Sequence, residues 1–161
     1  MAEVVFYEKP GCGGNARQKA MLEQAGHRVI ARDLLSEEWT PATLRPFFGN
    51  RPVAEWFNRA APAVKSGEVV PEAMDEAAAL AAMVARPLLV RRPLMRVGDR
   101  RECGFDTSLV DAWIGLGGAA GQGPMEGCLR PDMPPCPKPW PRRRSRPWRR
   151  TAIAAAPQVR R

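Results

Sequence analysis

The hydrophobic and polar residues near the start of the chain follow first a strand pattern and then a helix pattern. Apolar residues at 4–7 predict a short buried strand over 3–7, a glycine-rich turn follows, and the segment 15–25 has the period of a helix. The segment 27–34 predicts a second strand. Thr40 and Pro41 together predict the start of another helix, with the threonine as N-cap and the proline in the first turn.

The middle of the chain has the pattern of several helices. Trp56 and Phe57 lie in a short apolar segment, and we expect both side chains to lie in the core. The alanine-rich stretch that follows predicts the clearest helix of the chain, with Pro71 at its start. The larger apolar residues of that helix share one face, namely Leu80, Met83 and Val84.

The next part of the chain predicts two strands and a helix. PLLVRRPLMRVGDRREC indicates two strands joined by a hairpin turn at 97–99. FDTSLVDAWIGL predicts a closing helix that Thr107 or Ser108 can cap, with an apolar face made of Leu109, Ala112, Trp113 and Leu116. The order of a β-α-β unit, several helices and a β-β-α unit is typical of an α/β protein with a thioredoxin-like fold and a helical insertion.

The composition changes near residue 117. Residues 1–116 contain 15 basic and 15 acidic residues, whereas residues 117–161 contain 10 and 2, together with 9 of the 17 prolines. The net charge of +8 therefore belongs to the tail, which has too few aliphatic residues to form a core and is predicted to be a disordered Pro/Arg-rich extension. The folded domain is expected to span residues 2–116.

Composition also limits the partners. The neutral domain gives no electrostatic indication of nucleic-acid binding, although PRRRSRPWRR in the tail could bind nucleic acid or an acidic partner, or could simply be a solubilising extension. We expect no signal peptide, and the sequence has no apolar run long enough to span a membrane and no cysteine pair at metal-binding spacing. We therefore expect a cytoplasmic protein with reduced thiols, no membrane contact and no bound metal or cofactor.

Cys12 lies at the junction between the first predicted strand and the first predicted helix. Glycines leave space around its sulfur, and the thiol would face the unpaired N–H groups and the positive dipole end of the helix, which stabilise a thiolate. Lys9 and Arg17 add positive charge nearby. The alternative is a small buried cysteine at a strand end. Because Asn15 stands where a CxxC motif has its second cysteine, disulfide chemistry would need a thiol from elsewhere.

Three separated segments resemble one protein family. FYEKPGCGGNARQKAMLEQAGH is similar to the N-terminus of the arsenate reductase family, which also includes the Spx regulators. FNRAAPAVKSGE and LLVRRPL resemble two further segments of that family in the same order, and the likeness covers about residues 2–116. Within the family the chain is most similar to the nitrogenase-associated proteins of nitrogen-fixing bacteria, with which it shares EKPGC, NARQK, WFNRAAP, RRPL and WIGL.

The resemblance implies an oxyanion site around Cys12. In the arsenate reductases a thiolate at this position attacks arsenate, arginines that match Arg59 and Arg92 hold the oxyanion, and glutathione with glutaredoxin completes the reduction. Guanidinium groups and backbone N–H groups suit a tetrahedral oxyanion because they donate several charge-assisted hydrogen bonds. The remaining residues that we assign to the site form the turn or support it, namely Gly13, Gly14, Asn15, Arg17 and Pro93.

Two expectations concern the second half of the site. The family has a third arginine where this chain has Gly104, so we expect anion binding to be roughly ten- to a hundredfold weaker than with three arginines. The Arg92–Pro93 peptide bond is expected to be cis, because thioredoxin-like folds place a cis proline opposite the reactive cysteine. Arg59 has an alternative interpretation as a solvated charge at a helix end.

The other cysteines are not expected to take part. Cys103 is expected to be a small core residue rather than a resolving thiol. Cys128 and Cys136 lie in the proline-rich tail, where we expect exposure without a metal or redox function, although either function could occur there.

Two classes of function remain open. The first is a thiol-dependent oxidoreductase of arsenate reductase type that acts on a small oxyanion or a protein disulfide, with glutathione or glutaredoxin as reductant. The second is a non-catalytic interaction or regulatory protein, similar to Spx, whose partner is a protein related to nitrogenase or its metal supply. Cys12, Arg59 and Arg92 favour the first class, and Gly104 favours the second.

Overall fold

The computed structural model describes residues 1–118 of the 161-residue chain. The predicted disordered tail, with Cys128 and Cys136, therefore lies outside the described residues, apart from Gly117 and Gly118.

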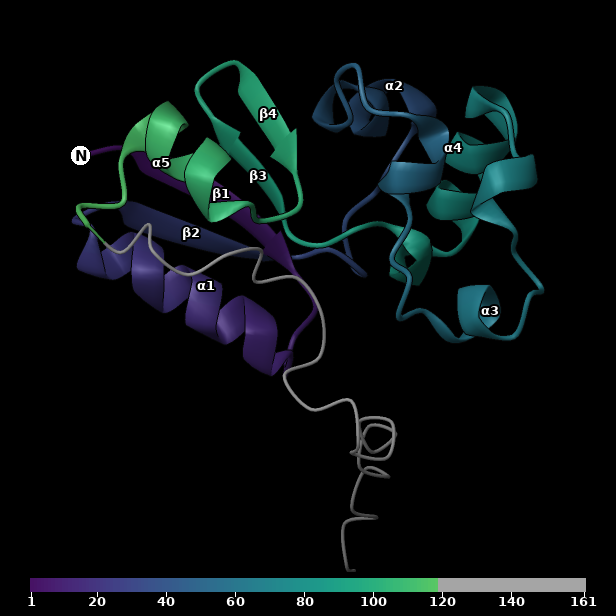
Figure 1. Ribbon diagram of the computed structural model, residues 1–161, viewed down its shortest axis with the longest axis horizontal. Coiled ribbons are helices and arrows are strands. Elements are labelled where there is room, and N and C mark those ends of the chain that lie inside the picture. Colours follow the sequence, from purple (N-terminus) through teal and green to yellow (C-terminus); the bar gives the residue numbers. More distant parts are fainter. Residues whose placement is uncertain (119–161) are drawn as a thin grey trace, which may run out of the picture. The chain divides into compact units, whose positions relative to one another are not determined.

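A four-stranded sheet in the order β2-β1-β3-β4 organises the described residues. β1 (Glu3–Glu8) pairs in parallel with β2 (Arg28–Asp33) and antiparallel with β3 (Leu94–Val97), which pairs antiparallel with β4 (Arg100–Cys103). The outer strands are thus β2 and β4. The element order confirms the predicted thioredoxin-like α/β fold (Figure 1).

The helices α1 (Gly13–Gln24) and α5 (Thr107–Ile114) pack against one face of the sheet. Successive side chains of a strand point to opposite faces, so Val4 and Phe6 belong to this face, where they join a buried cluster with Leu22 of α1 and Val110 of α5. The β-α-β part of the prediction is confirmed, with α1 beginning directly after Cys12.

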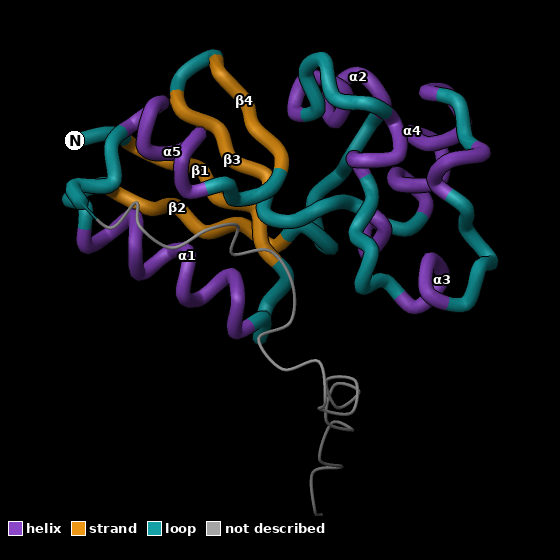
Figure 2. The backbone as a smooth tube through the Cα atoms, viewed as in Figure 1, coloured by secondary structure: helices purple, strands orange, loops and turns teal. Residues whose placement is uncertain are grey.

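Residues between β2 and β3 form the predicted helical insertion. Figures 1 and 2 show it as short helices separated by loops, namely α2 (Pro41–Leu44), α3 (Pro62–Lys65) and α4 (Glu76–Ala85). Val5 and Tyr7, from the opposite face of β1, join a second buried cluster with the apolar residues of this insertion. Trp56 and Phe57 lie in that cluster, as expected, with exposed fractions of 1% and 2%.

Two predictions for this region are wrong, because the backbone there forms a capped helix start and 3₁₀ turns at positions where the sequence pattern predicts a helix start and a strand. The long helix begins at Glu76 rather than at Pro71, since the Asp75 carboxylate accepts a hydrogen bond from the Ala78 N–H (2.7 Å) and so caps α4. Pro71 begins a separate 3₁₀ turn. The stretch 87–89 is also a 3₁₀ turn, so the strand expected there starts only at Leu94. Thr40, by contrast, caps α2 as predicted.

The expected cap and face of the closing helix also need correction. Asp106, and neither Thr107 nor Ser108, caps α5 by accepting hydrogen bonds from the backbone N–H groups of Ser108 (2.9 Å) and Leu109 (3.2 Å). Its buried face contains Val110, whereas Leu109 is 46% exposed. Of the other predicted face residues, Ala112 is exposed, Trp113 is partly buried and Leu116 is buried.

His27 connects the start of the chain to the end of α5. Its Nδ1 accepts a hydrogen bond from the Ala2 N–H (3.1 Å), and its Nε2 donates to the Gly115 carbonyl (2.6 Å). This pattern assigns a neutral imidazole with its proton on Nε2, and the ring is only 7% exposed. The histidine therefore has a structural role.

Candidate functional site

The segments that carry the candidate residues meet at one edge of the sheet. The parallel register brings the ends of β1 and β2 to the same edge. The antiparallel registers pair Tyr7, near the end of β1, with Leu94, and Leu94 with Cys103. The loop before α1, the chain before β3 and the chain after β4 therefore share this edge, which we call the Cys12 edge.

Cys12 is the N-cap residue of α1, and its partly exposed thiol is free and makes no capping hydrogen bond. Its backbone N–H donates to the Lys9 carbonyl (3.1 Å), and its carbonyl accepts from the Ala16 N–H (3.1 Å). Because that second bond is the first α-helical bond, the N–H groups of residues 13–15 have no α-helical acceptor. Cys12 therefore lies at the N-terminus of α1, next to the backbone N–H groups that have no α-helical acceptor and at the positive end of the helix dipole.

Asn15 holds the loop around Cys12 with its side chain. Its Oδ1 accepts a hydrogen bond from the Lys9 N–H (3.4 Å), and its Nδ2 donates to Gln18 Oε1 (2.9 Å). Both amide side chains are buried, with exposed fractions of 3% and 2%. The sequence predicts a place for Asn15 in the turn but not this role of its side chain. Two amides three residues apart on the inner face of a helix are the signal that could have indicated this pair.

Two other side chains near the loop lie on α1. Lys19 Nζ lies 2.6 Å from Glu8 Oε1, and both side chains are largely buried, so this ion pair fastens the end of β1 to the helix. Arg17, which we assigned to the support of the site, lies exposed on α1.

Arg92 and Pro93 lie at the Cys12 edge. Their peptide bond is cis, as predicted. Pro93 directly precedes β3, and its carbonyl accepts a hydrogen bond from the Gly104 N–H (2.8 Å), so the two chain segments lie side by side. Arg92 is partly exposed, and within residues 1–118 its side chain has no hydrogen bond or ion pair.

Arg59 is engaged on the helical insertion. Its Nη1 lies 2.6 Å from Glu72 Oε1, and its Nη2 donates to the Ala54 carbonyl (3.3 Å). The hydrogen bond from Arg59 lowers the pKa of Glu72 below its usual value. The pair is therefore intact at neutral pH and is lost only when acidification protonates the carboxylate. An anion at Arg59 would therefore compete with Glu72 for the guanidinium.

A backbone bridge joins the segments of Arg59 and Arg92. Phe57 pairs antiparallel with Val90, and flanking backbone hydrogen bonds of 2.7 and 2.8 Å extend the contact. Because the pairing is antiparallel, the chain continues from Phe57 to Arg59 in one direction and from Val90 to Arg92 in the other. The bridge thus joins the two segments without placing the two arginines opposite each other.

Cys103 lies in the core, as expected. It is 1% exposed, and its Sγ lies 3.6 Å from the Arg91 carbonyl oxygen. Residues 1–118 contain no cluster of three or more possible metal ligands. None of the helices in this part of the chain has the length and apolarity that crossing a membrane requires.

Replacing Gly104 with arginine should destabilise the fold rather than simply complete the arginine trio. Gly104 is buried and has φ +82°. An L residue in that conformation costs about 1–2 kcal/mol, and burying a guanidinium adds to this cost. Urea denaturation measures the loss, and Gly104→Ala, which has the backbone cost without the charge, is the control. Equal stability of Gly104→Arg and the unaltered chain would contradict this prediction.

Comparisons with known proteins agree with this architecture. The chain matches the ArsC family over residues 7–113. An uncharacterized 15.7 kDa protein in the draG 3' region of Rhodospirillum rubrum is 61% identical over 116 residues, which span 72% of this chain and 81% of that protein.

Solved structures show the same fold at lower identity. An ArsC family related protein from Bacteroides fragilis has a TM-score of 0.61 at 20% identity and covers 68% of this chain and 97% of its own. An arsenate reductase from Vibrio cholerae has a TM-score of 0.55 at 22% identity, with coverages of 64% and 90%. The family match and the Rhodospirillum relative together lead to the conclusion that this chain belongs to the ArsC family.

Proposed function

We propose that this chain is a thiol-dependent oxidoreductase in which the Cys12 thiolate attacks disulfide bonds. The observation that carries the proposal is the free, partly exposed thiol at the N-cap of α1, beside backbone N–H groups that have no α-helical acceptor. The buried Asn15–Gln18 pair supports it, because this pair fixes the loop that presents the sulfur.

The reaction is a thiol–disulfide exchange. The Cys12 thiolate attacks one sulfur of the substrate disulfide, that S–S bond breaks, and the second sulfur leaves as a thiolate. A glutathione thiolate then attacks the substrate sulfur of this mixed disulfide, so that its bond to Cys12 breaks and Cys12 leaves as a thiolate. A second glutathione, directly or through a glutaredoxin, reduces the substrate–glutathione disulfide that remains, which frees the substrate thiol and releases oxidised glutathione. Cys103 is too deeply buried to take the place of glutathione.

The arginines support a disulfide substrate over an inorganic oxyanion. Arg92 is available at the Cys12 edge, but Arg59 is paired with Glu72, and Gly104 offers no side chain. An oxyanion needs several cationic donors at once, whereas a disulfide needs only the nucleophile and a stabilised leaving thiolate.

A second candidate is a non-catalytic interaction protein linked to nitrogen fixation. It is favoured by the resemblance to nitrogenase-associated proteins and by the name of the Rhodospirillum relative, which places that protein in the draG 3' region. In this role the fold would bind a macromolecular partner, and this binding would not require the third arginine.

A coupled turnover assay tests these alternatives. The full chain is incubated with glutathione and glutaredoxin, and with either arsenate or a small model disulfide, and the Cys12→Ser variant supplies the background. We expect Cys12-dependent turnover of the disulfide. Turnover of arsenate alone would assign the oxyanion reaction instead, and turnover of neither substrate would favour the interaction protein.

A further inference from the structure

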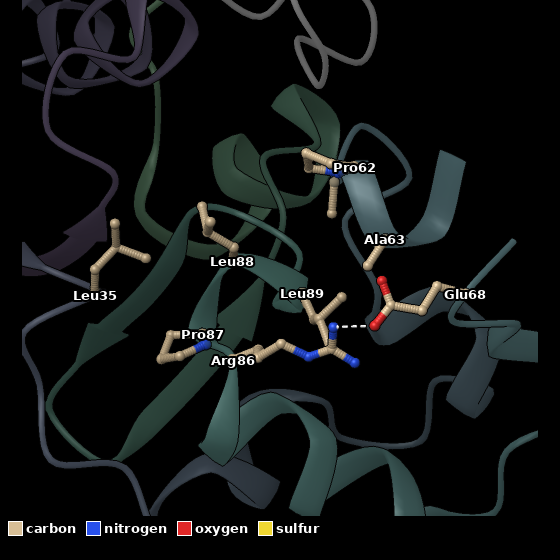
Figure 3. Close-up of a pocket in the computed structure, with 9 residues that line it drawn as sticks. Leu35, Pro62, Ala63, Glu68, Arg86, Pro87, Leu88 and Leu89 are labelled. Atoms are coloured by element: carbon tan, nitrogen blue, oxygen red, sulfur yellow. Dashed lines mark hydrogen bonds and ion pairs between the residues drawn. The ribbon is translucent and has the colours of Figure 1, made fainter. Parts of the chain in front are cut away.

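The apolar cavity on the helical insertion is not part of the thiol site. It has a volume of about 500 Å³ and is lined by residues that include Leu35, Pro62 and Leu88 (Figure 3). None of the candidate residues around Cys12 contributes to its walls. The feature next to the thiol that the fold leaves unexplained is instead a pair of glycines at the start of α1.

Gly13 and Gly14 differ from the other described glycines in their backbone conformation. Of the 11 glycines among residues 1–118, nine have a positive φ, which favours glycine over other residues. Gly13 and Gly14 are the two exceptions, and both lie in the first turn of α1, directly after Cys12. Glycine is a poor helix former, and alanine in this turn would stabilise the helix. The backbone conformation therefore does not require glycine at these two positions.

Packing among the described residues does not require glycine at position 13 either. Gly13 is exposed, and a Cβ atom at this position would have no heavy atom within 4 Å beyond its chain neighbours and the backbone of its own helix. This open space lies next to Cys12, because the Cα atoms of consecutive residues are about 3.8 Å apart. Glycine is common where the backbone must approach a ligand closely. The space is therefore suited to a molecule that approaches the thiol.

The loop before Gly13 is held in place, so a larger residue at position 13 would narrow the approach to the thiol. The Cys12 N–H donates to the Lys9 carbonyl (3.1 Å), and Gly11 between them has φ +78°. The Lys9 N–H donates to the buried side chain of Asn15 (3.4 Å). Both backbone groups of Lys9 are thus engaged, and the turn cannot shift away from α1 without losing these hydrogen bonds.

We propose that Gly13 is a specificity-determining residue, which allows a disulfide carried by a polypeptide chain to reach Cys12. This inference rests on the proposed exchange reaction and defines its substrate class. A small disulfide has only a few atoms on each sulfur and can reach the thiol past a side chain at position 13. A cysteine within a polypeptide has chain on both sides, so this chain lies against the first turn of α1 when the two sulfurs meet. Glycine leaves position 13 of that turn free of side-chain atoms.

Two reagents with the same leaving group test this inference on the full chain. In the small reagent, thionitrobenzoate is linked as a mixed disulfide to 2-mercaptoethanol, and in the peptide reagent it is linked to the central cysteine of a short peptide. Attack of the Cys12 thiolate on the mercaptoethanol or peptide sulfur breaks the S–S bond and releases the coloured thionitrobenzoate thiolate. Rates are corrected with Cys12→Ser, which retains the other thiols. We expect the unaltered chain to react with both reagents.

Gly13→Val should lower the ratio of the peptide rate to the small-reagent rate by at least about tenfold, because the valine side chain occupies the space that the peptide needs. The ratio isolates access, since the small reagent reports any change in the reactivity of the thiol itself. Gly13→Ala is an independent variant in case valine disturbs the start of α1. It should raise the urea midpoint, as alanine does in helices, and lower the ratio by a smaller factor than valine.

Ala112→Val is the matched control, because it also enlarges an exposed residue of a helix. α5 begins near the Cys12 edge and runs toward Gly115, whose carbonyl bonds to His27 at the opposite edge of the sheet. A side chain added at Ala112 is therefore far from the thiol along this helix. This variant should keep the rate ratio of the unaltered chain.

The outcomes separate the inference from the proposed function. An unchanged rate ratio in the folded Gly13 variants, or a lower urea midpoint for Gly13→Ala, contradicts the role of Gly13 and leaves the exchange reaction standing. Reaction of Cys12 with the small reagent only has the same meaning. If Cys12→Ser releases thionitrobenzoate from both reagents as fast as the unaltered chain does, the exchange reaction is wrong, and the inference fails with it.

Discussion

Replacing Cys12 with serine should reduce disulfide turnover by about a thousandfold or more while leaving the protein at least as stable as before. A serine hydroxyl is not ionised at neutral pH, so the nucleophile is lost. Cys12 is nevertheless at the N-cap of α1 and makes no capping hydrogen bond. Serine is a favoured N-cap residue, and we expect it to raise the free energy of unfolding by up to about 1 kcal/mol.

Two measurements on matched variants test whether turnover is lost while stability is retained. Coupled turnover and urea denaturation are carried out on Cys12→Ser and Cys12→Ala. Both variants should lose activity equally, but only serine should stabilise the fold, because alanine cannot cap the helix. Retention of turnover by either variant would exclude Cys12 as the nucleophile.

Trp56→Ala should destabilise the protein by about 3–5 kcal/mol. The Trp56 ring is 1% exposed and stacks on Phe48 with a centroid distance of 4.5 Å. Its indole N–H donates to the Arg51 carbonyl (2.8 Å), and the Arg45 guanidinium lies 5.1 Å from the ring centroid. The substitution removes all of these contacts and leaves a cavity in the cluster that joins the insertion to β1.

Chemical denaturation monitored by circular dichroism measures this loss. Val70→Ala is the control, because Val70 is 47% exposed and its truncation should change stability by no more than about 0.5 kcal/mol. Trp56→Phe should fall between the two, since it keeps an aromatic ring but not the indole hydrogen bond. A loss below about 1 kcal/mol for Trp56→Ala would show that the insertion does not depend on this side chain.

The order and type of the elements could be predicted because their signals are local. The apolar run of β1, the Thr40–Pro41 start of α2 and the hairpin at 97–99 each depend on residues within a few positions. Errors arose where two local signals competed. Pro71 and Asp75 both suit a helix start, and the side-chain hydrogen bond of Asp75 determined where α4 begins.

The site could be predicted only in part. The position of Cys12 at a helix start depends on neighbouring residues and could be predicted from them. The pairing of Arg59 with Glu72 and the assembly of the cavity from Leu35 and Leu88 depend on contacts between distant segments, which no local pattern specifies. The burial of the Asn15 amide likewise depends on tertiary packing.

The outer strands of the sheet have a consequence for self-association. β2 contains Arg28, Arg32 and Asp33, and β4 contains Arg100, Arg101 and Glu102, so charged side chains lie along both margins. The unpaired backbone groups of an outer strand can template the strand of another molecule, which is a common first step of aggregation. Arg28 and Arg100 are paired with Glu3 and Glu102, so these margins are strongly charged without being uniformly positive. A strand that added to either margin would have to remove water from these charged groups, which opposes growth of the sheet into a continuous intermolecular ribbon.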